Sequence, residues 1–274
     1  MKIKRAYIEI TNQCNLRCSF CIPHNRTYQF MSLNNFKKVI DSLLPLTSYF
    51  YLHVHGEPMM HPQLEQFLDY CDSKQAHVQL VTNGSFLEHY LSIFDHPSLR
   101  KLSISVHSID FQQQDANELL KNITHYINVV KKKDGQYLEL RFWTKNQLSK
   151  KAIALLSELQ SHYNFKSYSS NQFKIDRQVF IHFDEAFEWP STSQNSKPYG
   201  TCLGGKKMMA ILVDGTVTPC CLDCRGDIVF GNIFETPINQ IISGNQYQSF
   251  LNSLSRNKFI EPLCLNCNYR NRFD

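Results

Sequence analysis

The sequence predicts an α/β fold built on a parallel sheet, followed by a small hairpin-and-helix extension. Between residues 6 and 159, short apolar strand patterns alternate with helix patterns whose apolar residues recur at three- and four-residue spacing. Alternation of this kind implies parallel strands joined by right-handed helical crossovers. After residue 200 the alternation stops, and Asp214-Gly215 lies between two apolar runs, which predicts a β-hairpin.

The strand and helix patterns follow one another in a regular order. Strands are expected at residues 6–10, 49–54, 78–81, 102–106 and 137–142. Apolar helix stripes are expected at residues 36–44, 64–71, 119–130 and 153–159, with a short helix after Gly84. Ser32 is a typical helix cap, and Pro45 ends the helix that it starts. Because the carboxyl ends of parallel strands share one edge, the residues that follow these strands are expected to form the site.

The rest of the chain has a different pattern. Residues 164–200 are rich in Ser, Asn, Gln and Lys, and we expect one last strand there, at 179–183, and a bridging loop. The hairpin is followed by a predicted helix at 238–254 and by a terminal Cys-x-x-Cys. These changes predict two domains, at residues 1–190 and 191–274.

Composition excludes several classes of protein. The 274 residues carry a net charge of +5 that is spread along the chain, which argues against a dedicated nucleic-acid binder. The N-terminus has no apolar signal region, and no apolar stretch reaches the length of about 18 residues that a membrane helix needs. We therefore expect a cytoplasmic protein without nucleic-acid or membrane partners. Its ten cysteines then indicate metal or redox chemistry rather than disulfides.

The first cysteines are closely spaced. Cys14, Cys18 and Cys21 form a Cys-x3-Cys-x2-Cys loop directly after the first predicted strand. Three thiolates at this spacing can bind three irons of a 4Fe–4S cluster and leave the fourth iron open for an arriving ligand. A zinc knuckle or three buried thiols is the alternative. Zinc normally takes four ligands, however, and His24 is the one further candidate at zinc spacing.

A second group of cysteines lies in the last quarter of the chain. It consists of Cys202, Cys220, Cys221, Cys224, Cys264 and Cys267. The turn at Gly215 brings Cys202 and Cys220 to the same end of the predicted hairpin, and the terminal pair returns there after a helix. Four thiolates would close an iron–sulfur cluster with no open iron. A zinc ribbon built from the same cysteines is the alternative.

The first loop and the residues after it resemble the radical S-adenosylmethionine (radical SAM) superfamily. The loop is the hallmark of that family, and His55-Gly56-Glu57-Pro58 is similar to its Gly-Gly-Glu-Pro motif. The resemblance implies a partial (β/α)6 TIM-like barrel and a 4Fe–4S cluster on the three cysteines of the loop. This cluster would cleave S-adenosylmethionine to a 5′-deoxyadenosyl radical. Phe20, the typical aromatic residue of the loop, would bind the cofactor, and Gly56 and Glu57 would receive its amino group.

Further cofactor-binding residues are implied by the same resemblance. Thr82-Asn83-Gly84 is similar to the turn after the third strand of the family, which makes Asn83 a candidate. Ser103, Ser105 and His107, near the end of the fourth strand, lie where relatives contact the ribose or carboxylate of S-adenosylmethionine. Arg141 on the fifth strand is expected to pair with that carboxylate, because a guanidinium suits bidentate binding.

The C-terminal cysteines resemble the SPASM or twitch extension of the same superfamily. The supporting residues are Cys202, Gly215-Thr-Val-Thr-Pro-Cys220-Cys221, Gly231-Asn-Ile and Pro237-Ile. The resemblance implies a second, auxiliary 4Fe–4S cluster. Its implied ligands are Cys202, Cys220, Cys264 and Cys267, with Cys221 and Cys224 as alternatives. The shorter twitch form is the better match, because no cysteine follows the terminal pair.

The two resemblances together predict an oxidoreductase. It would abstract a hydrogen atom from a small polar metabolite and use the auxiliary cluster as electron acceptor. Asp184 and Glu185, at the end of the last predicted strand, are the candidate proton acceptors. Maturation of a ribosomal peptide and a non-catalytic zinc or iron–sulfur module are the alternatives. A low-potential electron donor such as flavodoxin or ferredoxin is the expected partner.

Overall fold

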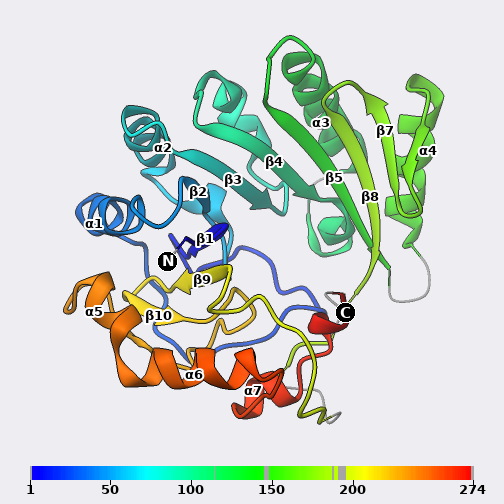
Figure 1. Ribbon diagram of the computed structural model, residues 1–274. Helices are drawn as coiled ribbons and strands as arrows, with labels where there is room; N and C mark the ends of the chain where they lie inside the picture. The colour runs from blue at the N-terminus through cyan, green and yellow to red at the C-terminus, as the bar shows by residue number, and fades with distance from the viewer. Residues whose placement is uncertain (1, 114, 145–147, 187, 191–195, 273–274) are drawn as a thin grey trace. The chain divides into compact units, whose positions relative to one another are not determined.

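The computed structural model describes residues 2–113, 115–144, 148–186, 188–190 and 196–272, and of Thr144 the backbone alone. The chain forms two compact units, which Figure 1 shows by element. The first unit consists of Met1–Gln13, Ile22–Gly56 and Phe187–Asp274, and the second of Cys14–Cys21 and Glu57–Ala186. The domain boundary predicted after residue 190 falls beside residues 191–195, outside the described residues, and stays a prediction.

The second unit contains a mixed sheet covered by helices. Its described strands are β3 (His77–Thr82), β4 (Leu99–Ser105), β5 (Tyr137–Thr144), β6 (Lys166–Ser169), β7 (Gln172–Asp176) and β8 (Val179–Glu185). Its α-helices are α2 (Leu64–Ser73), α3 (Ala116–Val130) and α4 (Lys150–His162), and its 3-10 turns are η1 (Pro58–Met60), η2 (Leu87–Tyr90), η3 (Ile93–Asp95) and η4 (Val106–Phe111). The strand order is β3-β4-β5-β8-β7-β6. Strands β3, β4, β5 and β8 are parallel, and α2 packs on β3 and α3 on β5 (Figure 1).

The two faces of this sheet differ in chemistry, because successive side chains of a strand point to opposite sides. One face is apolar and fully buried, and its members include Leu102, Ile104, Leu138, Leu140 and Ile181. The other face carries polar side chains in register, since Ser103 pairs with Glu139, and Arg141 with both Ser105 and His182. We call this second surface the polar face. Its members are Lys101, Ser103, Ser105, Glu139, Arg141, Trp143, His182 and Asp184.

The first unit is built around the N-terminal strand. Its described strands are β1 (Arg5–Ile8), β2 (Tyr49–Tyr51), β9 (Met208–Ile211), β10 (Thr216–Thr218) and β11 (Gly231–Asn232), in the order β11-β10-β9-β1-β2. Its helices are α1 (Leu33–Leu43), α5 (Ile238–Ser243), α6 (Asn245–Ser255), α7 (Pro262–Leu265) and the 3-10 turn η5 (Tyr269–Arg272). Strand β1 is parallel to both β2 and β9, whereas β9, β10 and β11 are antiparallel. The hairpin predicted at Asp214-Gly215 is confirmed, and Gly215 has the positive φ of +88° that its turn requires.

Three elements differ from the sequence-based prediction. The helix predicted at 238–254 is wrong as a single element, because Gly244 is extended and separates α5 from α6. The β6–β7 hairpin lies where a bridging loop was predicted. All four side chains of β6 are exposed, so no apolar alternation marks the strand. The short helix expected after Gly84 consists of the 3-10 turns η2 and η3.

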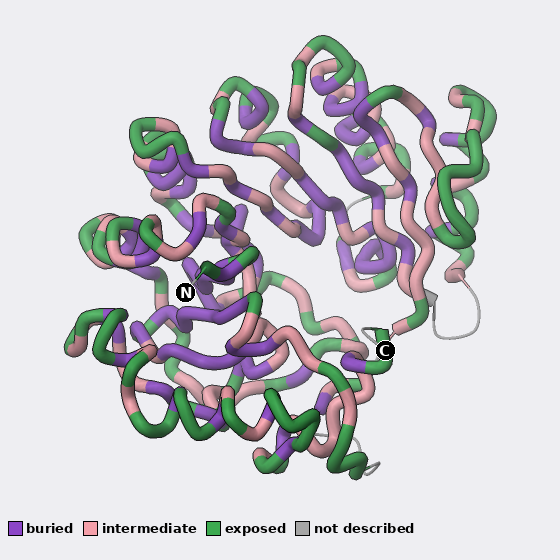
Figure 2. Tube along the Cα trace, in the orientation of Figure 1, coloured by how far each residue is buried: buried purple, intermediate pink, exposed green. Residues whose placement is uncertain are grey.

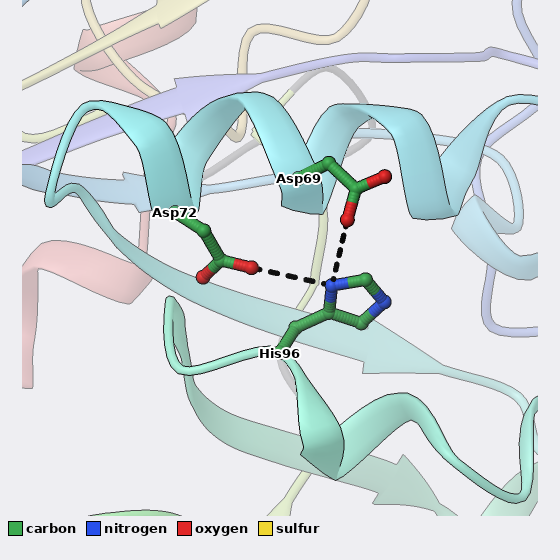
Figure 3. A group of neighbouring side chains, drawn as sticks. All are labelled: Asp69, Asp72 and His96. Carbon is green, nitrogen blue, oxygen red and sulfur yellow. Dashed lines mark hydrogen bonds and ion pairs between the residues drawn. The ribbon is translucent and has the colours of Figure 1, made fainter.

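Figure 2 shows that much of the buried chain lies along the inner strands of each unit, while the helices are buried along one side. A polar contact group also positions the start of β4. His96 Nδ1 lies 3.3 Å from an oxygen of Asp69 and 3.3 Å from one of Asp72, both on α2 (Figure 3). Asp72 also accepts the backbone N–H of Ser98, which fixes the chain that enters β4.

Among the described residues, no helix is both long enough and apolar enough to span a membrane.

Candidate functional site

The cysteine loop of the second unit holds three thiols close together. Cys14 and Cys21 are exposed and Cys18 is half-buried. The Cys21 N–H donates to the Cys18 carbonyl at 3.0 Å, which forms a tight turn, and the Leu16 N–H donates to Cys14 Sγ at 3.4 Å. Burial, and then the neighbouring charges of Cys14 and Cys21, raise the pKa of Cys18 to about 12. Three thiolates at this site therefore need a positive centre to balance them, which fits an iron–sulfur cluster.

The carboxyl group of Glu57 is a buried hydrogen-bond acceptor beside this loop. Its Oε1 accepts from the Met59 N–H at 2.9 Å and from Thr82 Oγ1 at 2.7 Å, and its Oε2 accepts from the Asn83 N–H at 2.6 Å. Burial raises the pKa of Glu57 to about 7, although these three donors favour the ionised form. A carboxylate has about four lone-pair sites, so one acceptor position remains, on Oε2.

Asn83 joins the turn after β3 to the cysteine loop. Its Nδ2 donates to Asn15 Oδ1 at 2.9 Å and lies 3.8 Å from Cys14 Sγ. Its carbonyl oxygen accepts from Ser108 Oγ at 2.8 Å and from Gln112 Nε2 at 2.6 Å. The structure thus brings Glu57, Asn83 and Cys14 together, as the sequence predicted from motifs far apart along the chain.

Gly56 and His55 belong to the first unit, where they lie against the segments that flank the cysteine loop. A Cβ atom on Gly56 would lie 2.6 Å from the carbonyl oxygen of Thr11 and 2.7 Å from that of Gln13, and its φ is +77°. Glycine is therefore required at this position. His55 Nε2 lies 2.9 Å from the carbonyl oxygen of Ile22 and donates to it, and burial lowers the pKa of His55 to about 4.

Aromatic rings surround Phe20 of the cysteine loop. Its ring centroid lies 5.0 Å from that of His107, 5.8 Å from that of Phe111 and 6.0 Å from that of Trp143. His107 and Trp143 stack with centroids 4.7 Å apart, and the Arg141 guanidinium lies 4.8 Å from the Trp143 ring centroid. Phe111 and Trp143 were missed from the sequence. Trp143 lies two residues after Arg141 on one strand, so the alternation of β5 was the available signal.

His107 is held as a neutral hydrogen-bond acceptor. Its Nδ1 donates to the Arg141 carbonyl oxygen at 3.1 Å, which leaves the lone pair on Nε2. Burial lowers the pKa of His107 to about 4. Ser105, another of the predicted ribose contacts, is half-buried on the polar face, and its carbonyl accepts from Ser108 Oγ at 2.7 Å.

Glu139 organises the middle of the polar face. Ser103 Oγ donates to its Oε2 at 2.7 Å, and Lys101 Nζ lies 2.9 Å from the same oxygen. His182 Nδ1 lies 3.8 Å from Oε1. Although burial opposes it, the Lys101 ammonium keeps the pKa of Glu139 below its ordinary value. Ser103 and His182 were candidates from the sequence, whereas Lys101 and Glu139 were not singled out there.

The two predicted proton acceptors lie on different faces of β8. Asp184 pairs with Trp143, so it shares the polar face, and it is half-buried. Glu185 is the next residue along the strand, points to the opposite side and is exposed. Asp184 therefore lies closer to the other candidate residues.

The predicted auxiliary ligands all lie in the first unit. Burial, and then the charges of Cys221, Cys202 and Cys264, raise the pKa of Cys220 well above its ordinary value. Burial, and then the charges of Cys202 and Cys267, also raise the pKa of Cys264. These influences connect Cys202, Cys220, Cys264 and Cys267 in one set, to which Cys221 also belongs, and such a set fits the predicted closed iron–sulfur site.

Two further cysteines lie in this region. Cys221, like Cys220, packs on the buried group of Tyr7, Met208 and Ala210, and burial followed by the charge of Cys221 raises the pKa of Tyr7. Cys224 is 1% exposed, and its charge acts on Arg26. The choice between these two cysteines and the four predicted ligands stays a prediction.

Comparison with known proteins gives two family matches. Residues 8–134 match the radical SAM superfamily, and residues 202–268 match SPASM, an iron–sulfur cluster-binding domain. A similar curated protein is the GTP 3′,8-cyclase of Aquifex aeolicus (strain VF5), which is 28% identical over 123 residues. That match covers 39% of this chain and 36% of the cyclase, so the chain spans little more than a third of this relative.

Two solved structures have a similar fold. BtrN in complex with AdoMet and 2-DOIA has a TM-score of 0.64 at 19% identity. The alignment covers 98% of this chain and 94% of the BtrN chain. Streptococcus suis SuiB bound to the precursor peptide SuiA has a TM-score of 0.61 at 13% identity. The alignment covers 99% of this chain and 73% of the SuiB chain. The predicted α/β fold class is thereby confirmed. The chain belongs to the radical SAM superfamily, carries a C-terminal SPASM extension, and is an enzyme that uses S-adenosylmethionine and iron–sulfur clusters.

Proposed function

We propose that this enzyme oxidises a small polar metabolite at a carbinol carbon. When bound, the open iron–sulfur cluster supplies the electron that cleaves S-adenosylmethionine to the 5′-deoxyadenosyl radical. The observation that carries the proposal is the polar face of the second unit. It presents an ammonium, a carboxylate, a hydroxyl and an imidazole group from Lys101, Glu139, Ser103 and His182.

Such a surface suits a ligand rich in hydroxyl and amino groups. Buried polar groups need partners, and a polyhydroxylated or aminated ring provides several within a small volume. BtrN, whose structure contains 2-DOIA, matches this chain over nearly its whole length, which supports a similar ligand class. Asp184 is the proposed proton acceptor, because it lies on the polar face, and Glu185 is the alternative.

The cofactor would be held by residues around the cysteine loop. We assign the cluster to Cys14, Cys18 and Cys21, and the amino group of S-adenosylmethionine to the remaining acceptor position of Glu57. Asn83 orients the loop, and Phe20 offers a ring for the adenine. Further contacts are assigned to the Ser105 hydroxyl, His107 Nε2 and the Arg141 guanidinium.

The auxiliary cluster is assigned to the four converging thiols of the first unit, Cys202, Cys220, Cys264 and Cys267. A closed site of this kind accepts or passes electrons and does not bind substrate directly. A low-potential donor such as flavodoxin or ferredoxin remains the proposed external partner. The match to SuiB with its bound peptide SuiA favours peptide modification as the second candidate function.

Isotope transfer distinguishes the two candidates. We expect deuterium from the carbinol carbons of aminocyclitols or sugars to appear in 5′-deoxyadenosine, because hydrogen abstraction moves that atom to the cofactor. Mass spectrometry of 5′-deoxyadenosine after incubation with deuterated polyols, and separately with deuterated peptides, measures it. If deuterium is transferred from the peptides and not from the polyols, the substrate is a peptide and the proposed oxidation of a metabolite is wrong.

Glu57→Gln is expected to lower the affinity for S-adenosylmethionine by about tenfold to a hundredfold, the contribution of one charge-assisted hydrogen bond. The substitution also replaces one of the two acceptor oxygens by an NH2 group, which cannot accept a hydrogen bond. At least one of the bonds from Met59, Thr82 or Asn83 is therefore lost. Equilibrium dialysis with labelled S-adenosylmethionine measures the change. The absorption spectrum of the clusters should stay as in the parent.

The pH dependence of binding is the control for this variant. With a pKa of about 7, Glu57 is protonated below that pH and ionised above it. The ionised carboxylate accepts an N–H more strongly, so the affinity of the parent should rise between about pH 6 and about pH 8. Glu57→Gln has no such group and should lack this rise. Equal affinity in parent and variant across that range would show that Glu57 does not receive the amino group.

A further inference from the structure

A buried ion pair in the first unit joins the two segments that flank the cysteine loop. Glu9 precedes Cys14 by five residues, and Arg26 follows Cys21 by five. Arg26 Nη1 donates to Glu9 Oε2 at 2.7 Å, and Nη2 donates to Oε1 at 2.6 Å. The Glu9 side chain is 0% exposed and that of Arg26 is 14% exposed. The pair is thus bidentate and shielded from water, the geometry in which a guanidinium fixes two chain segments most firmly.

A second set of hydrogen bonds joins the same two segments closer to the loop. Asn12 Nδ2 donates to the Thr27 carbonyl at 2.8 Å, and Asn12 Oδ1 accepts from the Gln29 N–H at 2.8 Å. Thr11 Oγ1 donates to the Gln29 carbonyl at 2.8 Å. Asn12 is fully buried, so both ends of its amide are used within the protein. The two flanks are therefore held together by side chains of the chain itself.

The C-terminal extension contributes to the same contacts. The Val213 N–H, in the turn between β9 and β10, donates to Glu9 Oε2 at 3.0 Å. Arg225 donates from Nε and Nη2 to the carbonyl oxygen of Pro23, at 3.2 and 3.1 Å. Pro23 is the second residue after Cys21, and Arg225 is the fifth after Cys220. Residues of the extension therefore hold the segment that leaves the first cysteine loop.

These contacts have a direct consequence for cluster binding. A cluster with three thiolate ligands is held only as well as the loop keeps those thiolates in one arrangement. Fixing the ends of a short loop removes much of the conformational freedom that cluster binding would otherwise have to restrict. We propose that Glu9, Arg26 and Arg225 are positioning residues, which fix both flanks of the cysteine loop and make retention of the first cluster dependent on the C-terminal extension.

The test measures how fast the first cluster is lost to a chelator. Arg26→Lys keeps the charge and loses the bidentate fork, and Arg225→Ala removes an exposed guanidinium. The matched control is Arg177→Met, which removes an exposed arginine from a surface ion pair with Asp134. Anaerobically reconstituted proteins are treated with bathophenanthroline, and each cluster is followed by EPR. The signal that changes on adding S-adenosylmethionine reports the first cluster, and the unchanged signal reports the auxiliary cluster.

We expect Arg26→Lys to lose the first cluster about tenfold faster than the parent, the factor for one charge-assisted hydrogen bond. Arg225→Ala should lose it several-fold faster, and Arg177→Met at the parent rate. The auxiliary cluster should be lost at the parent rate in all three, because a general loss of stability would release both clusters together. First-cluster rates in Arg26→Lys and Arg225→Ala equal to that of Arg177→Met overturn the proposal, as does equal acceleration for both clusters. Should Arg26→Lys not fold, Arg225→Ala decides alone. The measurement involves no substrate, so it is independent of the proposed oxidation.

Discussion

Replacing Cys14, Cys18 and Cys21 together by alanine is expected to abolish cleavage of S-adenosylmethionine and to halve the bound iron. The parent should hold about eight irons in two cubane clusters, and the variant about four. The reason is that these three thiols are the assigned ligands of the open cluster, and burial, followed by the charges of Cys14 and Cys21, already raises the pKa of Cys18. Iron analysis after anaerobic reconstitution and chromatography of 5′-deoxyadenosine measure the two effects.

Cys71 provides the matched control for this substitution. It is a fully buried cysteine on α2 and lies apart from both cysteine groups along the chain. Cys71→Ala removes a thiol without removing a ligand, so its iron content and its cleavage activity should equal those of the parent. Cleavage that survives in the triple variant would contradict the assignment of the first cluster.

Replacing Cys264 and Cys267 by alanine is expected to abolish substrate oxidation while cleavage of S-adenosylmethionine continues. The change removes two of four converging thiols, so the auxiliary cluster should be lost or badly damaged. The residues around the first cysteine loop are unchanged, so uncoupled production of 5′-deoxyadenosine should persist. Parallel assays of 5′-deoxyadenosine and of oxidised product measure the separation.

Metal binding is coupled to folding, so this variant needs its own control. It must be soluble and must bind S-adenosylmethionine as the parent does before its activity is interpreted. If the variant oxidises the substrate at the parent rate, the auxiliary cluster has no redox role in the reaction. Zinc in place of iron in the parent extension would contradict the twitch assignment itself.

The sequence predicted the strand-end part of the site because each motif follows its strand directly. Cys14, Glu57 and Asn83 could be brought together from topology alone, since parallel strands present their carboxyl ends at one edge. The polar face could not be predicted in the same way. The contact of Glu139 with Ser103 depends on the register between β4 and β5, which no local pattern states.

The contacts around the cysteine loop show the same limit. Glu9 interrupts an apolar run, so the sequence marked it only as a polar residue in a strand, and its partner is identified by geometry. The break at Gly244 had a local signal, yet apolar residues on both sides keep helical spacing, which favoured one continuous helix. The features that could not be predicted from the sequence therefore depend on burial and strand register, which local patterns do not give.

The position of β1 between β2 and β9 has a consequence for biosynthesis. Strand β1 is synthesised before its partner β9, which is completed about 200 residues later, and Val213 is separated from Glu9 by 204 positions. Pairing across such a separation carries a large loop-closure entropy and forms late. Until then, β1 presents an unpaired edge to the cell, and the first cysteine loop has only part of its support. Iron–sulfur assembly machinery would therefore meet a mature first site only after the extension has been synthesised, so a nascent chain that lacks the extension should not retain the first cluster.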